Sequence, residues 1–122
     1  MQPTEMRQVK MAESLHGDLK QLARRRSILL RELYDEAIRW FAALRNGRSY
    51  NQYLISPREG VYKSMWITTG VAEVATDIAA QDGVPQNRVI YTSLFLFFQD
   101  HCEASSVVVA PNGRENTVDR IR

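Results

Sequence analysis

The segment from Lys63 to Phe98 reads KSMWITTGVAEVATDIAAQDGVPQNRVIYTSLFLFF, and it predicts one short strand followed by two helices. Residues 63–68 alternate in character and carry β-branched and aromatic side chains, which is typical of a half-buried strand. From Val71 to Ala79, apolar residues recur at three- and four-residue steps, as on one face of a helix. Gly83 suits the left-handed end of this helix, and Pro85 suits the first turn of the next. The second helix is apolar on most of its surface, which predicts burial on most sides.

A unit of about forty residues cannot bury such a helix alone, so a partner is expected. Shifting the sequence by 56 positions, without a gap, aligns the same pattern of apolar residues in the first half of the chain. The aligned pairs are Val9 with Met65, Met11 with Ile67, Leu15 with Val71, Leu22 with Ile78, Leu33 with Val89, Tyr34 with Ile90, Ile38 with Leu94, and Phe41 with Phe97. We therefore predict one domain of two repeats, 6–44 and 63–101, joined by a linker over 45–62 and followed by a tail over 102–122.

The first predicted strand covers residues 6–12 and places Val9 and Met11 on its inner face. Its outer face then holds Gln8, Lys10 and Ala12, because Lys10 carries a charge that belongs in solvent or against a ligand. The repeat carries this register to the second strand. There Met65 and Ile67 face inward, and Ser64, Trp66 and Thr68 face outward. A lone tryptophan is more often a core residue, but the repeat favours an outward Trp66.

The first half is predicted to hold helices over residues 15–26 and 29–44, with Ser14 as the first N-cap. Asn46 and Gly47 end the second helix. Three cations close the first helix, namely Arg24, Arg25 and Arg26. They either complement the helix dipole as a solvated end or contact phosphates.

The chain has 122 residues, 44% of them hydrophobic, which is enough for the core of one domain. The net charge is only +2, but residues 1–61 hold 11 Lys and Arg against 7 Asp and Glu, whereas residues 62–122 hold 5 against 7. The first half is therefore the basic one, and if the chain binds a polyanion such as DNA, the cations of this half are expected to meet its phosphates. Cys102 is the only cysteine, which excludes an internal disulfide and fits a reducing compartment such as the bacterial cytoplasm. No signal-peptide core or run of about 20 apolar residues occurs.

No pattern of residues predicts catalysis, a metal or a cofactor. His101, Cys102 and Glu103 are adjacent, but neighbours on a helix point in different directions, and no second ligand pair stands at zinc spacing. Gly-rich phosphate loops and nucleophile elbows are absent from the sequence, so we do not expect an enzyme. Val107 to Val109 predict a short edge strand, and the last twelve residues predict a surface tail whose arginines serve solubility or add electrostatic grip.

A strand–helix–helix unit whose strand pairs with that of a second copy resembles the ribbon-helix-helix family of DNA-binding proteins. The resemblance covers residues 6–41 and 63–98 and implies a mostly α fold with a two-stranded antiparallel β-ribbon, in which a single chain forms a pseudo-dimer and acts as a monomer. It also implies that the ribbon enters the major groove of double-stranded DNA. The implied base-reading residues are Gln8, Lys10, Ala12, Ser64, Trp66 and Thr68. The implied phosphate contacts lie at the start of each second helix, at Leu30, Arg31, Gln86, Asn87 and Arg88.

The stretch LLRELYDEAI at residues 29–38, together with the tandem arrangement, is similar to the C-terminal domain of virulence proteins encoded in VirC operons of agrobacterial Ti plasmids. This similarity implies an accessory role in T-DNA processing and transfer at border and overdrive DNA. The implied protein partners are a relaxase and a ParA-like VirC protein. Because the two strands differ in sequence, we expect weak or asymmetric sequence preference. The alternative function is a protein-interaction module, antitoxin-like or a relaxosome scaffold, in which Trp66 or residues 107–109 carry the contact.

Overall fold

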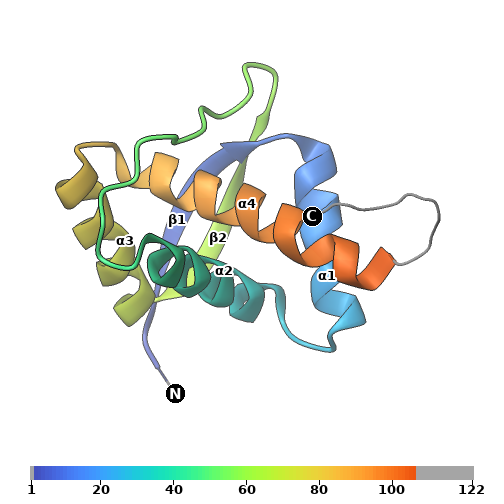
Figure 1. The fold of residues 1–122 in the computed structure, drawn as a ribbon. Coiled ribbons are helices and arrows are strands. Elements are labelled where there is room, and N and C mark those ends of the chain that lie inside the picture. The colour runs from blue at the N-terminus through green and yellow to red at the C-terminus, as the bar shows by residue number, and fades with distance from the viewer. Residues whose placement is uncertain (1, 107–122) are drawn as a thin grey trace.

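The computed structural model describes residues 2–106 and contains four helices and two strands (Figure 1). In chain order these are β1 (Thr4–Met11), α1 (Glu13–Arg25), α2 (Leu30–Arg45), β2 (Val61–Thr68), α3 (Thr69–Asp82) and α4 (Gln86–Ser106). The two strands pair antiparallel. The described part of the chain is therefore mostly helical with a small β-ribbon, which confirms the predicted secondary-structure class.

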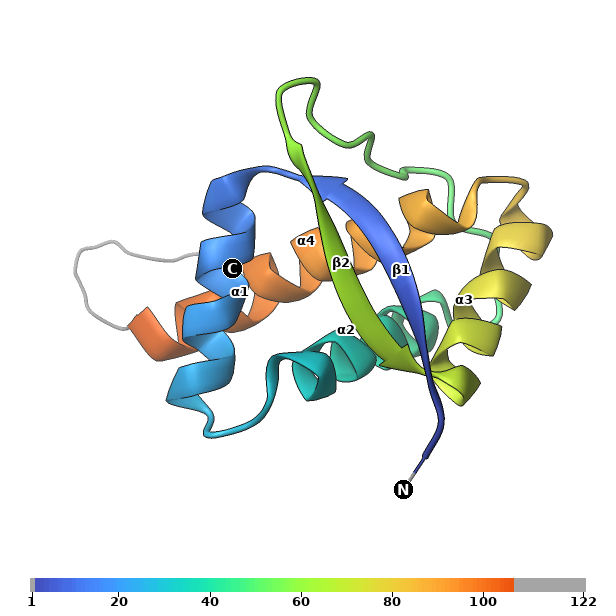
Figure 2. The ribbon, with the colours of Figure 1, turned by 180° about the vertical axis from the view of Figure 1, so that it is seen from behind.

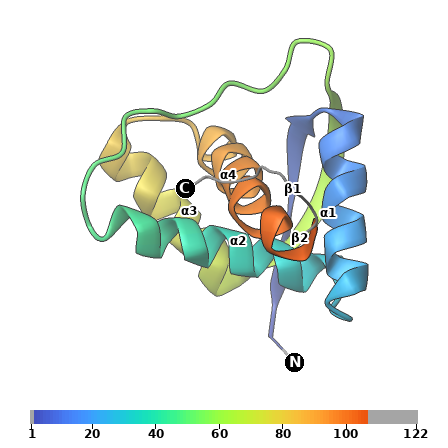
Figure 3. The same cartoon turned by 45° about the vertical axis from the view of Figure 1, so that its right-hand side comes forward.

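The ribbon lies on one side of the molecule, and α2 and α4 pack together behind it (Figure 2). Helices α1 and α3 lie at its two sides, α1 on the side of β2 and α3 on the side of β1 (Figure 2). The linker between α2 and β2 runs past α3 and over α4 before it reaches the ribbon (Figure 3). One face of the ribbon thus covers the core, and the other faces away from it.

The register of the ribbon is centred on Gln8, which lies opposite Ser64. The four residues predicted to face inward are at most 1% exposed: Val9, Met11, Met65 and Ile67. Trp66 is 53% exposed, so its outward prediction is also confirmed. Alternation along each strand therefore predicted correctly which side chains enter the core.

The predicted strand boundaries are wrong by one or two residues. Both strands begin two residues earlier than predicted, and β1 ends at Met11 instead of residue 12. Ala12 is the N-cap of α1, where its carbonyl oxygen accepts the amide of His16 at 3.2 Å. Its φ of −65° and ψ of 142° are extended, which continues the alternation by one residue past the strand. Ala12 is therefore not a ribbon residue, and Ser14 lies inside the helix rather than at its cap.

Helix α4 continues to Ser106, past residue 101, where the second repeat was predicted to end. Gln99 and Asp100 are exposed, so this last part of the helix lacks the apolar pattern that marks a buried face. Within residues 2–106 no helix, α4 included, has the length and apolar character needed to cross a membrane. The predicted strand at 107–109 and the arginines at 114, 120 and 122 lie outside the described residues.

The core is built where α2 and α4 meet the inner face of the ribbon. Its largest fully buried side chains include Phe41 and Phe97, which are aligned by the shift of 56 residues. The other positions of α2 and α4 that the shift aligns are buried as well, namely Leu33, Tyr34, Ile38, Val89, Ile90 and Leu94. Their burial confirms the predicted inner faces of both helices. Burial of α4 on most sides is incomplete, because Phe95, Leu96 and Phe98 are only partly buried.

The turns after α1 and α3 use the same left-handed backbone with different residues. Gly83 follows α3 with φ of +68°, and Ser27 follows α1 with φ of +58°. A Cβ added at Gly83 meets nothing within 4 Å, so only the backbone conformation favours glycine there. Ser27 carries a Cβ in the same conformation, which is unfavourable for an L-residue.

We expect Gly83→Ala to lower the free energy of unfolding by about 1 kcal/mol and Ser27→Gly to raise it by a few tenths of a kcal/mol to about 1 kcal/mol. The gain at Ser27 is the smaller of the two effects, because glycine also increases the entropy of the unfolded chain. Urea denaturation of both variants measures the difference. Changes of the same sign in the two variants would contradict this account of the turns.

A buried ion pair closes the end of the molecule where α2 and α3 finish. Arg45 donates to both carboxylate oxygens of Asp82, at 3.1 and 3.0 Å, and the two side chains are 5% and 0% exposed. Asp82 also accepts the hydroxyl of Tyr53 and, at 3.3 Å, the amide of Tyr50. Burial alone would raise the pKa of Asp82, but the hydrogen bonds from Tyr53 and Arg45 outweigh burial and hold this pKa below its ordinary value. We call this group the Arg45–Asp82 clasp, and it fixes the linker to both helices.

Candidate nucleic-acid interface

The outer face of the ribbon is an open surface formed by alternate residues of both strands. The register places four residues of each strand there: Thr4, Met6, Gln8 and Lys10 of β1, and Tyr62, Ser64, Trp66 and Thr68 of β2. Met6 lies opposite Trp66, and Lys10 lies opposite Tyr62. The predicted residues Gln8, Lys10, Ser64 and Trp66 are therefore brought together on one face.

Two large side chains of this face were absent from the predicted site. Met6 is 43% exposed and Tyr62 is 66% exposed. Met6 could have been found, because it has the same parity as Gln8 in the predicted strand. Tyr62 could not, since it precedes the predicted start of the second strand at residue 63. Thr68 is on this face but only partly exposed, and its hydroxyl is buried with no hydrogen-bond partner among the described residues.

Lys10 is the only charged side chain among these eight residues. Its ammonium group lies 5.9 Å from the centre of the Tyr62 ring, within the range of a cation–π contact. The face thus combines one cation with a methionine, a tyrosine and a tryptophan. Such a surface can contact base edges and methyl groups, but it supplies little phosphate affinity by itself.

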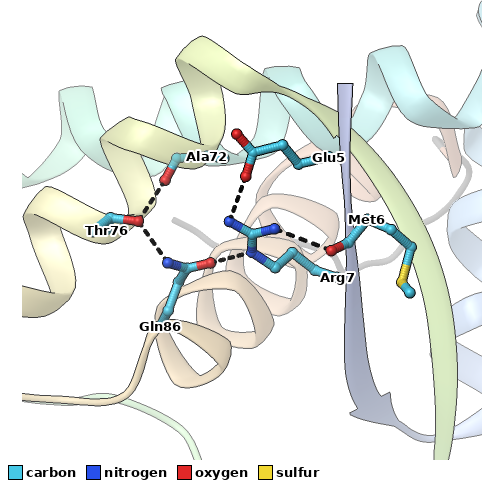
Figure 4. A network of polar contacts seen from close by, with 6 residues as sticks. All are labelled: Glu5, Met6, Arg7, Ala72, Thr76 and Gln86. Atoms are coloured by element: carbon cyan, nitrogen blue, oxygen red, sulfur yellow. Dashed lines mark hydrogen bonds and ion pairs between the residues drawn. The ribbon is translucent and has the colours of Figure 1, made fainter. Parts of the chain in front are cut away.

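Helix α4 begins beside β1 and is bonded to it through side chains. Asn87 donates its Nδ2 to the carbonyl oxygen of Gln8 at 3.0 Å. Arg7 donates to the side-chain oxygen of Gln86 and pairs with Glu5 at 2.8 Å, and Gln86 donates to Thr76 at 2.6 Å (Figure 4). The network fixes the start of α4 against the ribbon. It also occupies the side chains of Gln86 and Asn87, which leaves their backbone amides as the groups for an anion.

Helix α2 begins beside β2, and its first residues make fewer side-chain bonds to the ribbon than those of α4. Glu32 accepts the amide of Leu29 at 2.9 Å, and the carbonyl oxygen of Leu29 accepts the amides of Glu32 and Leu33. The amides of Leu30 and Arg31 precede the first intrahelical bond, as at any helix start. Arg31 is exposed, whereas its counterpart in the repeat is the bonded Asn87. A phosphate would therefore meet a cation as well as amides at α2.

Of the three arginines at the end of α1, Arg26 packs against other helices. Arg26 donates to Glu36 of α2 at 2.9 Å, and its guanidinium lies 5.5 Å from the ring centre of Phe97 in α4. Arg24 and Arg25 close the last turn of α1 and are exposed. Arg26 is thus held against α2 and α4, which favours the helix-end interpretation for this residue.

A pocket of about 400 Å³ lies between the outer face of β2 and the start of α2. Its lining includes Ser64 and Trp66 of the ribbon, Leu30, Arg31 and Tyr34 of α2, and His16 of α1. Tyr34 is 2% exposed, and its hydroxyl has no hydrogen-bond partner within the described residues. An unpaired buried hydroxyl costs about 1–3 kcal/mol in general. Burial raises the pKa of Tyr34 to about 12, so the hydroxyl is protonated at neutral pH.

His16 lies in the lining of this pocket, near several charged side chains. Its pKa is lowered first by burial and then by the charges of Lys63 and Lys20, with Glu13 opposing them. Lys63 is partly neutralised, because it pairs with Glu13 at 3.0 Å. The pocket therefore combines one guanidinium, a protonated hydroxyl and the face of an exposed indole.

Three comparisons, with protein-family models, with curated proteins and with solved structures, found no match for this chain. Within the described residues, no group of three or more His, Cys, Asp or Glu side chains is placed to hold a metal ion. The interface must therefore be interpreted from its own geometry.

Proposed function

We propose that this protein binds double-stranded DNA by inserting the outer face of the ribbon into the major groove, where two-stranded ribbons can fit. The observation that carries the proposal is an open ribbon face with a helix start on each side of it, α2 beside β2 and α4 beside β1 (Figure 2). In this arrangement the side chains of Gln8, Lys10 and Ser64 approach base edges, while the helix starts approach the phosphates that border the groove.

The spacing of the elements supports a single-chain ribbon-helix-helix pseudo-dimer. Helices α1 and α3 begin 56 residues apart, at Glu13 and Thr69, and α2 and α4 also begin 56 residues apart, at Leu30 and Gln86. The central ribbon pair, Gln8 and Ser64, has the same separation, as a two-fold axis through that pair requires. The biological role we propose is that of an accessory factor in T-DNA processing, acting beside a relaxase and a ParA-like partner.

We expect duplex affinity to fall steeply as salt rises, because each neutralised phosphate releases bound counterions. Lys10→Ala should weaken binding and relax sequence preference at the base that it contacts, whereas Arg31→Ala with Arg88→Ala should reduce the slope of log K against log salt by about 2. Fluorescence anisotropy of a labelled duplex at several salt concentrations measures both quantities. A scrambled duplex shows how much of the affinity depends on sequence.

Arg48→Ala is the matched control, since it removes the same charge from an exposed position in the linker that follows α2. The slope of log K against log salt for Arg48→Ala should equal that of the unmodified protein. Equal losses for Arg48→Ala and Lys10→Ala would contradict the assigned face, and unchanged affinity in every ribbon and helix-start variant would exclude it.

The second candidate function is a protein-interaction module, as in a relaxosome scaffold. It is favoured by the exposed side chains of Met6, Tyr62 and Trp66, three large apolar groups on one small face. Binding of a protein through this face should depend weakly on salt, unlike binding of phosphates. Absence of duplex binding at low salt would leave this candidate as the better one.

A further inference from the structure

The pocket beside β2 has the features of a site for a single unpaired nucleotide. Trp66 is 53% exposed and belongs both to the outer ribbon face and to the pocket lining. An exposed indole offers a flat surface on which a base can stack, and such stacking tolerates any base. A paired base within a duplex has its faces covered by its neighbours, so only an unpaired base can use this surface.

The opposite wall of the pocket suits the phosphate of the same nucleotide. Arg31 lies at the second position of α2, where backbone amides lack intrahelical acceptors. A guanidinium beside a helix start is a strong arrangement for phosphate oxygens, because charge-assisted bonds add to the amides.

Tyr34 gives an independent indication that the pocket is a binding site. Tyr34 is only 2% exposed, yet its hydroxyl has no hydrogen-bond partner within residues 2–106. Buried hydroxyls in proteins are normally paired, and an unpaired one needs an explanation. A ligand in the pocket that Tyr34 lines can supply the missing acceptor.

The described residues at the start of α4 have no equivalent arrangement. The shift of 56 residues places Gln86 and Asn87 at the positions of Leu30 and Arg31, and both side chains are bonded to β1. Ala72 and Ile90 take the positions of His16 and Tyr34 and offer no polar side chain. Within the described residues, the combination of an exposed indole, an arginine at a helix start and a buried tyrosine therefore occurs beside α2 and is not repeated beside α4.

We propose that the pocket binds one unpaired nucleotide, with its base on Trp66, its phosphate at Arg31 and the first amides of α2, and an acceptor atom paired with Tyr34. This inference goes beyond duplex binding, because the base must lie outside a double helix. The nucleotide comes either from a DNA single strand or from a free mononucleotide, and the chemistry of recognition is the same for both.

The test uses the intrinsic fluorescence of Trp66 in the full chain. Trp40→Phe leaves Trp66 as the only tryptophan, and Trp40 is a half-buried residue packed edge-on against Phe97, outside the pocket. In this background we titrate a short oligothymidylate, an abasic strand of the same length and thymidine monophosphate. We expect saturable quenching by oligothymidylate and roughly tenfold weaker binding of the abasic strand. Quenching by the strand alone identifies single-stranded DNA as the source, and equal quenching by the mononucleotide identifies free nucleotides.

Two variants separate the pocket from general electrostatic attraction. Arg31→Ala should weaken oligothymidylate binding roughly tenfold, whereas Arg39→Ala removes an exposed arginine of the same helix and should have little effect. Tyr34→Phe should weaken binding severalfold without lowering the melting temperature, since its hydroxyl is unpaired in the free protein.

The proposal is overturned if no quenching occurs at low salt, if the abasic strand binds as tightly as oligothymidylate, or if Arg39→Ala matches Arg31→Ala. Duplex binding is measured on the same protein samples by anisotropy. Duplex binding without quenching by oligothymidylate rejects the pocket and keeps the ribbon model, and the reverse result rejects the ribbon model alone.

Discussion

Asp82→Ala is expected to lower the free energy of unfolding by about 3–5 kcal/mol, because it leaves the guanidinium of Arg45 buried without its carboxylate. The side chains of Arg45 and Asp82 are 5% and 0% exposed, so water cannot replace the lost partner without opening the structure. The variant also removes the acceptor of Tyr53 and of the Tyr50 amide. Because small domains are stable by only about 5–15 kcal/mol, urea denaturation should show a large shift of the midpoint.

The ion pair between Arg26 and Glu36 is the matched control for the clasp. Its side chains are 32% and 46% exposed, so Glu36→Ala should cost no more than about 1 kcal/mol. Combining Asp82→Ala with Arg45→Met should recover part of the lost stability, since no buried charge then remains. Similar losses in Asp82→Ala and Glu36→Ala would contradict the role given to the Arg45–Asp82 clasp.

The clasp also predicts how stability depends on pH. The folded state holds the pKa of Asp82 below its ordinary value of 3.8, so the folded state favours the ionised form. The stabilisation is therefore complete above the ordinary value and is lost as the pH falls through the lower value of the folded state. We expect the unmodified protein to lose more stability than Asp82→Ala between pH 5 and strongly acidic pH, measured by urea denaturation across this range.

The sequence predicted the elements well because each depends on local periodicity. Alternation placed Met65 inward and Trp66 outward, and steps of three and four placed Phe41 and Phe97 in the core. Local patterns failed at the end of β1, because an extended N-cap residue cannot be told from a strand residue by alternation. Ala12 continues the alternation of β1, yet it already caps α1. The last part of α4 failed for a different reason, since an exposed helix end carries no apolar pattern.

The candidate site was only partly predictable from the sequence. Alternation along the strands identified the outward residues Gln8, Lys10, Ser64 and Trp66. It could not show that Asn87 bonds to the ribbon while Arg31 stays exposed. The pocket depends on side chains from four elements, and the clasp joins residues 37 positions apart. Such contacts between distant residues leave no periodic signal in the sequence. The sequence also does not distinguish a buried arginine such as Arg45 from an exposed one.

Met65→Ala and Trp66→Ala test the ribbon face directly, because they are neighbours on β2 that point to opposite sides. Met65 is 1% exposed, so its truncation should lower the free energy of unfolding by about 2–5 kcal/mol through lost burial and a cavity. Trp66 is 53% exposed, and its truncation should cost no more than about 1 kcal/mol although it removes the larger side chain. Binding should show the opposite order: at a temperature where both variants are folded, Trp66→Ala loses affinity for its nucleic-acid ligand and Met65→Ala keeps it. A greater loss of stability in Trp66→Ala than in Met65→Ala would mean that the strand presents its other face to the core, and the proposed interface would then be on the wrong side of the ribbon.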